Sequence, residues 1–159
     1  MQQKSLSKWL KFIIIGVGIC TLIVYGLMVP QMGQMIVEQN EEFGYRFWPW
    51  LIFIWATGIP CCIALIFAWK IAANIGADRS FSMANSNLLK WISVLAAGDA
   101  AFFFLGNIVL FFLDMSHPSV VLLSLLAVFA GVAVSVAAAA LSHLVMKAAI
   151  LQDESDLTI

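Results

Sequence analysis

Four apolar runs, each about as long as a bilayer is thick, constrain this chain more than any other feature of its sequence. They extend over residues 12–29, 47–69, 91–113 and 120–146. A helix needs about 20 mainly apolar residues to cross the hydrocarbon core. The runs lack the polar stripe of a water-soluble bundle, and only 11% of the chain is charged. The sequence therefore predicts an all-α integral membrane protein, with four transmembrane helices in two antiparallel hairpins.

The placement of the basic residues predicts the orientation. Four spans put seven of them on one side of the membrane and leave Arg46 alone on the other; the seven are Lys4, Lys8, Lys11, Lys70, Arg79, Lys90 and Lys147. Short cytoplasmic loops carry the excess of lysine and arginine. We therefore expect cytoplasmic N- and C-termini in a multi-pass protein of a bacterial inner membrane. The outer loop is expected at 30–46, the inner loop at 70–90 and a cytoplasmic tail at 147–159.

Asp99 is the only acidic residue well inside a predicted span. It lies about 13 Å along its helix from Lys90, near mid-depth. An ionisable group at this depth costs roughly 2.5 to 3.5 kcal/mol and marks a proton or ion path, a ligand site or a helix contact. The alternative is a protonated carboxyl group that bonds to a neighbouring helix. His143 lies nearer the cytoplasmic surface, where it is either an interfacial side chain or part of a water-linked relay with Asp99.

Two patterns indicate how the spans pack. Small residues recur every four positions in the fourth span, and such a row lets another helix approach closely; they are Ala127, Gly131, Ser135 and Ala139. Pro60 lies inside the second span and should bend it, because proline removes a helical hydrogen bond. The bend is either a hinge or a static kink.

Local signals predict where helices begin and end. Pro30 and the polar residues after it should end the first span. Gly76 can end the second helix in a left-handed conformation. Ser82 can cap the start of the third.

Two stretches resemble a known family. The first contains Ile59-Pro60, Lys70-Ile71, Asn74-Ile75 and Ser80-Phe81-Ser82, and the second contains Leu141-Ser142-His143 and the ending Asp156-Leu157-Thr158-Ile159. They resemble the bacterial membrane family named domain of unknown function 2975, from about the second span onward. The resemblance implies a four-span protein. Many members are encoded beside a small helix-turn-helix regulator of the Cro/repressor type, which implies such a regulator as a partner.

The leading hypothesis is a non-enzymatic membrane sensor or regulator that binds a cytoplasmic transcription regulator. Its binding residues would be Phe81 in the inner loop and the tail residues Asp156, Leu157, Thr158 and Ile159. One alternative is a small oligomeric transporter or proton-coupled channel that uses Asp99, with several copies around one pore. Another is an immunity protein that binds a membrane-active peptide.

No motif points to an enzyme. Intramembrane hydrolysis needs an acid pair, a serine with its base or a metal cluster at matched depth, and only Asp99 lies deep in a span. Adjacent cysteines in a helix, such as Cys61 and Cys62, point in different directions and suit no shared metal. We therefore expect no catalytic residue, metal, cofactor or direct nucleic-acid binding. The expected surroundings are the lipid bilayer and, as a candidate, further copies of the chain.

Overall fold

The computed structural model describes residues 3–39, 42, 44–116 and 118–157. This part of the chain forms α1 (Gln3–Ile23), the π-helical turn η1 (Val24–Met28), α2 (Val29–Gln39), α3 (Gly44–Gly76), α4 (Met83–Phe112) and α5 (Pro118–Leu157). It contains four helical segments long and apolar enough to cross a membrane, because α1, η1 and α2 form one continuous helix. The predicted all-α membrane fold is confirmed. Each helix is longer than the span predicted within it.

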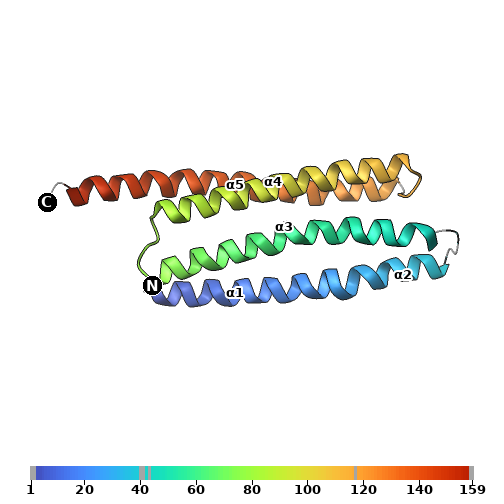
Figure 1. Ribbon diagram of the computed structural model, residues 1–159, viewed down its shortest axis with the longest axis horizontal. Helices are drawn as coiled ribbons and strands as arrows, with labels where there is room; N and C mark the ends of the chain where they lie inside the picture. The colour runs from blue at the N-terminus through green and yellow to red at the C-terminus, as the bar shows by residue number, and fades with distance from the viewer. Residues whose placement is uncertain (1–2, 40–41, 43, 117, 158–159) are drawn as a thin grey trace.

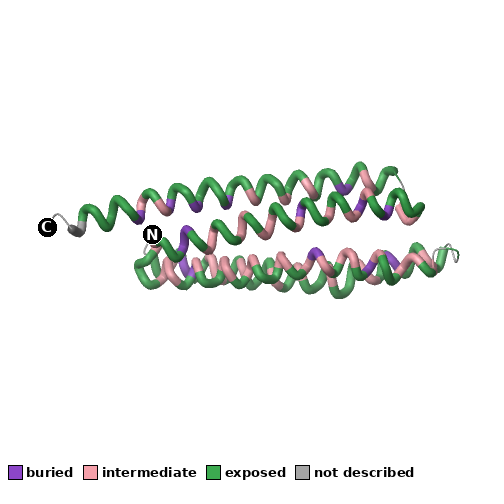
Figure 2. The backbone as a smooth tube through the Cα atoms, turned by 45° about the horizontal axis from the view of Figure 1, so that its top comes forward, coloured by how far each residue is buried: buried purple, intermediate pink, exposed green. Residues whose placement is uncertain are grey.

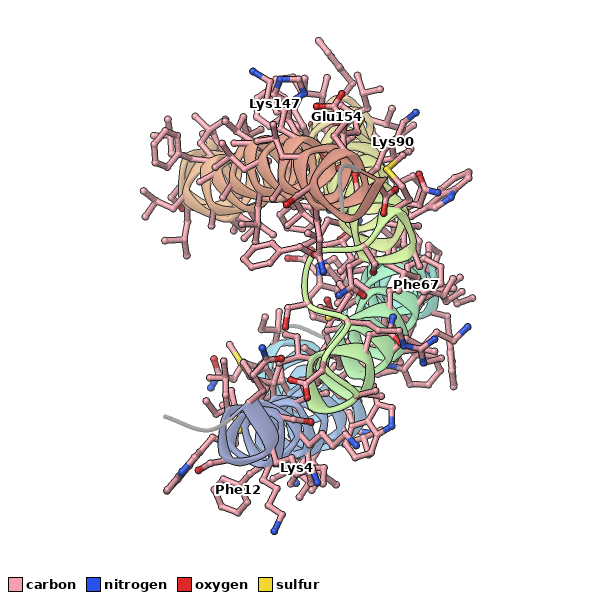
Figure 3. All side chains as sticks on the ribbon, turned by 90° about the vertical axis from the view of Figure 1, so that its left-hand side faces the viewer. Lys4, Phe12, Phe67, Lys90, Lys147 and Glu154 are labelled. Atoms are coloured by element: carbon pink, nitrogen blue, oxygen red, sulfur yellow. The ribbon has the colours of Figure 1, made fainter. Side chains whose placement is uncertain are left out.

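The four long helices lie in a row (Figure 1). α1 packs against α3, α3 against α4, and α4 against α5. Among the described helices, α5 contacts α4 alone, and α1 contacts neither α4 nor α5. Seen from the end, the row is an open arc (Figure 3). Most of the tube in Figure 2 is accordingly coloured exposed, as suits apolar helices covered by lipid.

Both chain ends lie at the same end of the row (Figure 1), as two hairpins require. We call it the lysine end, because the adjoining parts of the helices carry Lys4, Lys8, Lys11, Lys70, Lys90 and Lys147. The positive-inside rule predicts that the lysine end faces the cytoplasm.

The first helix continues through Pro30 instead of ending there. Pro30 has no N–H with which to bond to the preceding turn of the helix. The π-helical turn η1, which is wider than an α-helical turn, lies just before it. Within η1 the Val29 N–H donates to the carbonyl of Val24. The Tyr25 carbonyl accepts a hydrogen bond of 2.9 Å from the indole N–H of Trp55 on α3. Residues 30–39 and 44–46 of the predicted outer loop are therefore helical.

The prediction that Gly76 ends α3 in a left-handed conformation is wrong. Asp78 takes that conformation, with φ of 58°. Its position lets the Arg79 N–H donate to the Asn74 carbonyl at 3.0 Å, as in a Schellman motif. Aspartate tolerates the left-handed region better than most residues. Position 76 requires glycine because of packing, since a Cβ there would lie 2.7 Å from Oγ of Ser7 on α1.

A similar turn ends α4 at the opposite end of the row. Asp114 has φ of 54°, and the Met115 N–H donates to the carbonyl of Leu110 at 2.8 Å. The Arg46 guanidinium of α3 donates to the Asp114 carbonyl. Arg46 therefore joins the two hairpins at this end.

Candidate functional site

The turn between α3 and α4 is held by Asn85, whose side chain is 1% exposed. Its amide nitrogen donates to the carbonyls of Arg79 and Ser80, both at 3.0 Å. Its amide oxygen accepts from Nδ2 of Asn74 at 2.7 Å. The predicted cap at Ser82 is confirmed, because its Oγ accepts from the Asn85 N–H at 3.3 Å. These bonds give the turn a defined shape at the lysine end.

The start of α1 is fastened to the same turn. The buried Ser7 hydroxyl donates to the Ala72 carbonyl at 2.6 Å, and the Ser80 hydroxyl donates to the side-chain oxygen of Gln3 at 3.0 Å. Three of the four long helices therefore meet in one hydrogen-bonded cap.

The residues predicted to bind a partner lie at this end where the structure describes them. Phe81 lies in the turn and is 58% exposed. Asp156 and Leu157 belong to the last turn of α5, but their side chains are outside the described part, as are Thr158 and Ile159.

α5 extends past the beginning of α4 (Figure 1). The contact between the Ser86 and Ser142 hydroxyl oxygens, 3.2 Å apart, sets the register of the two helices. It places Met83, the first residue of α4, level with about residue 145. Residues 146–157 therefore project about 18 Å beyond α4 at 1.5 Å per residue. In this projecting part Leu151 is 65% exposed.

Serines and small residues line the contact between α4 and α5. The Ser86 hydroxyl donates to the Ser142 carbonyl at 2.9 Å, and the Ser142 hydroxyl donates to the Ser86 carbonyl at 2.8 Å. The Ser135 hydroxyl donates to the Ser93 carbonyl at 2.9 Å. A Cβ at Gly131 would lie 3.0 Å from the Cβ of Ala100. These small side chains let the two backbones approach closely.

The face of α5 that meets α4 follows a spacing of three and four residues. Its buried or half-buried positions are 121, 124, 128, 131, 135, 138, 142 and 145. Ala149, beyond the start of α4, continues the spacing and is also buried. Of the predicted row, Gly131 and Ser135 lie on this face, whereas Ala127 and Ala139 are exposed. A row spaced by four rotates about 40° around the helix at each step, but alternating threes and fours stays in line. His143 is also exposed, so it lies off the contact.

Asp99 lies level with Pro60 of α3. Two α3–α4 contacts fix this register: Asn74 bonds to Asn85, and the Phe53 ring covers Gly106. α3 continues through Pro60, and proline there deprives the carbonyl four residues earlier of its usual N–H partner. Oδ1 of Asp99 is buried and has no hydrogen-bond partner within the described part of the chain.

A pair of hydroxyl groups lies within about one helical turn of the level of Asp99. The Tyr25 hydroxyl lies 3.0 Å from the Thr57 hydroxyl, which itself donates to a backbone carbonyl at 2.7 Å. We call Asp99, Tyr25 and Thr57 the mid-span cluster.

The mid-span cluster contains one carboxyl group and no basic side chain. Residues 12–29, 47–69 and 91–113 contain no lysine, arginine or histidine. An aspartate without a counter-charge can hold a proton or a small cation. The sequence predicted Asp99 but not the hydroxyl pair. The available signal was a hydroxyl at similar depth in each of two other spans. Across the described residues, no three His, Cys, Asp or Glu side chains gather as a metal site would require.

Comparison with known protein families identifies the family of this chain. The family model described as protein of unknown function DUF2975 matches residues 31–159. The uncharacterized membrane protein YoaS of Bacillus subtilis (strain 168) is 27% identical over 153 residues, which cover 95% of this chain and 96% of that protein. No solved structure matches. Because the matched region extends from α2 to the end of the chain, this four-span membrane protein belongs to the DUF2975 family.

Proposed function

We propose that this protein is a non-enzymatic membrane regulator whose lysine end binds a cytoplasmic helix-turn-helix transcription regulator. The turn at Phe81 and the projecting part of α5 provide the binding surface. The partner class follows from the family, many of whose members are encoded beside such a regulator.

The observation that carries this proposal is the projection of α5 past α4. The register of α4 and α5 places the turn at Phe81 level with about Lys147. An exposed aromatic ring therefore lies beside the first residues of the projecting part of α5. Ile150 and Leu151 add exposed apolar surface further along. A helix face of this kind, next to a turn of defined shape, suits the apolar groove of a partner protein.

A pull-down tests the proposal directly. The bait would be the membrane protein in detergent, and the captured partner a helix-turn-helix regulator of the Cro/repressor type. Four baits would be compared: the full-length chain, Phe81→Ala, Leu151→Ala and a chain truncated after Gln152. Leu122→Ala is the matched control, because Leu122 is equally exposed but lies near the start of α5, at the opposite end. We expect about a tenfold loss of affinity for Phe81→Ala or Leu151→Ala, as for a central interface residue. Equal recovery from every variant, or none from the full-length chain, would contradict the proposal.

A second candidate function is proton-coupled transport by an oligomer. The observation in its favour is the buried Oδ1 of Asp99, which has no hydrogen-bond partner among the described residues and lies level with a proline in the neighbouring helix. Groups of this kind mark proton pathways in membrane proteins. One chain forms an open arc of four helices, so several copies would have to enclose the path.

Proteoliposomes that contain a pH-sensitive dye test this candidate. Flux should disappear in Asp99→Asn and persist in Asp114→Asn. The control removes a carboxylate at the end of the row, and asparagine tolerates the positive φ of Asp114. Flux that is unchanged in Asp99→Asn excludes the proposed role of Asp99.

A further inference from the structure

The lysine end of the α1–α3 pair carries a cluster of basic side chains. Lys4, Lys8 and Lys11 are spaced by four and three residues, so they share one face of α1. The ammonium group of Lys11 lies 5.3 Å from the ring centroid of Trp69 on α3, and Lys70 follows Trp69. We call these five residues the lysine–tryptophan cluster.

This cluster has no acidic counterpart on its own helices. Neither α1 nor α3 contains an aspartate or a glutamate. Within the described residues, none of the four lysines takes part in an ion pair. Lys147 on α5 differs, because Asp153 and Glu154 follow it on the same helix. The positive charge at the α1–α3 end is therefore available to an anion from outside the chain.

The position of the cluster indicates which anion. Tryptophan is enriched at the level of the lipid headgroups, and a cation over its ring lies at the same depth. Phe12 directly follows Lys11 and is 69% exposed, so apolar surface begins where the basic surface ends. An anionic group joined to a hydrocarbon chain matches both surfaces.

We propose that the lysine–tryptophan cluster binds the headgroup phosphate of an anionic phospholipid. Lys8, Lys11 and Lys70 contact the phosphate oxygens as hydrogen-bond donors, and an acyl chain lies along α1 beside Phe12. The long stems of the lysines cover apolar surface while their ammonium groups stay at headgroup level. This site is independent of the proposed regulator binding, which uses Phe81 and α5.

Native mass spectrometry of the full chain tests the proposal. Purified protein in detergent would be titrated with phosphatidylglycerol, with phosphatidylcholine and with inorganic phosphate. The test variant is K8Q/K11Q/K70Q, and the matched control is K90Q/K147Q, which removes charge at the same end but from α4 and α5. Figure 3 shows Lys4 at one end of the arc and Lys147 at the other. Circular dichroism would verify that both variants are folded.

We expect the unmodified chain to retain phosphatidylglycerol in preference to phosphatidylcholine. The triple variant should bind phosphatidylglycerol about tenfold more weakly or worse, given the attraction of each lysine to an anionic surface, whereas the control should bind as the unmodified chain does. Equal binding of both lipids, an equal loss in the control, or no loss in the triple variant overturns the proposal. Inorganic phosphate that competes as well as the lipid would overturn the assignment to a lipid.

Discussion

Gly106→Ala is expected to weaken the contact between α3 and α4. The Phe53 ring of α3 occupies the place of the missing side chain, since its nearest carbon lies 2.0 Å from an ideal Cβ at position 106. The ring has little freedom to retreat. It stacks on Phe103, with centroids 5.8 Å apart and planes inclined by 2°, and it lies 5.4 Å from the ring of Phe102. An added methyl group must either break this stack or separate the helices.

The magnitude follows from two opposing effects. Extra volume in a packed contact costs about 1–3 kcal/mol. Replacing glycine by alanine inside a helix otherwise stabilises it by roughly 0.5–1 kcal/mol. Gly98→Ala shows the second effect alone, because no neighbouring atom lies within 4 Å of a Cβ at that position of the same helix. We expect Gly106→Ala to be less stable than Gly98→Ala by about 1–3 kcal/mol.

Reversible unfolding in mixed micelles, followed by circular dichroism, measures this difference. Combining Gly106→Ala with Phe53→Leu provides a further check, because the smaller side chain makes room for the methyl group. The two substitutions together should therefore cost less than the sum of their separate effects. Equal stability of the Gly106→Ala and Gly98→Ala variants would refute the close contact, and with it the register that places Pro60 level with Asp99.

Three further predictions concern individual contacts and use the same unfolding assay. Ser86→Ala and Ser142→Ala should each cost about 0.6 kcal/mol, the average for a hydrogen bond between membrane helices; no loss in either variant would contradict the two bonds from hydroxyl to carbonyl. Asp78→Val should cost about 1–2 kcal/mol because of its positive φ, whereas Asp78→Gly should not, and equal losses would argue against the left-handed turn. Tyr25→Phe should cost about 0.6 kcal/mol, and the loss should vanish in a Thr57→Val background if the two hydroxyls bond to each other.

The sequence alone determined the class of fold. The length and apolar character of each run are local properties, so four spans and two hairpins follow without knowledge of any contact. Ser82 is equally local, because an N-cap serine needs only the helix that it begins. Asp99 could also be found in this way, since a single carboxyl group stands out in apolar sequence.

Which residues meet was decided by the tertiary structure. In lipid, a leucine that faces a neighbouring helix and one that faces a fatty-acid chain are chemically alike, so hydrophobicity does not mark the contact face. For this reason the predicted row of small residues, spaced by four, included Gly131 and Ser135, which lie on the contact face, but also Ala127 and Ala139, which are exposed. The hydroxyl pair at the level of Asp99 comes from η1 and α3, and only helix packing brings the two hydroxyls together.

The helix ends also depend partly on local sequence and partly on tertiary structure. Gly76 and Asp78 are both acceptable near the end of a helix by local chemistry. The close approach of Ser7 on α1 requires glycine at position 76. The left-handed conformation lies two residues later, at Asp78. The projection of α5 depends likewise on its register with α4, set by the serine pairs. The sequence thus determined that the chain crosses a membrane and where its charges lie. Helix packing determined which side chains share a site, because contact faces in a membrane depend on side-chain size and hydrogen bonding rather than on hydrophobicity.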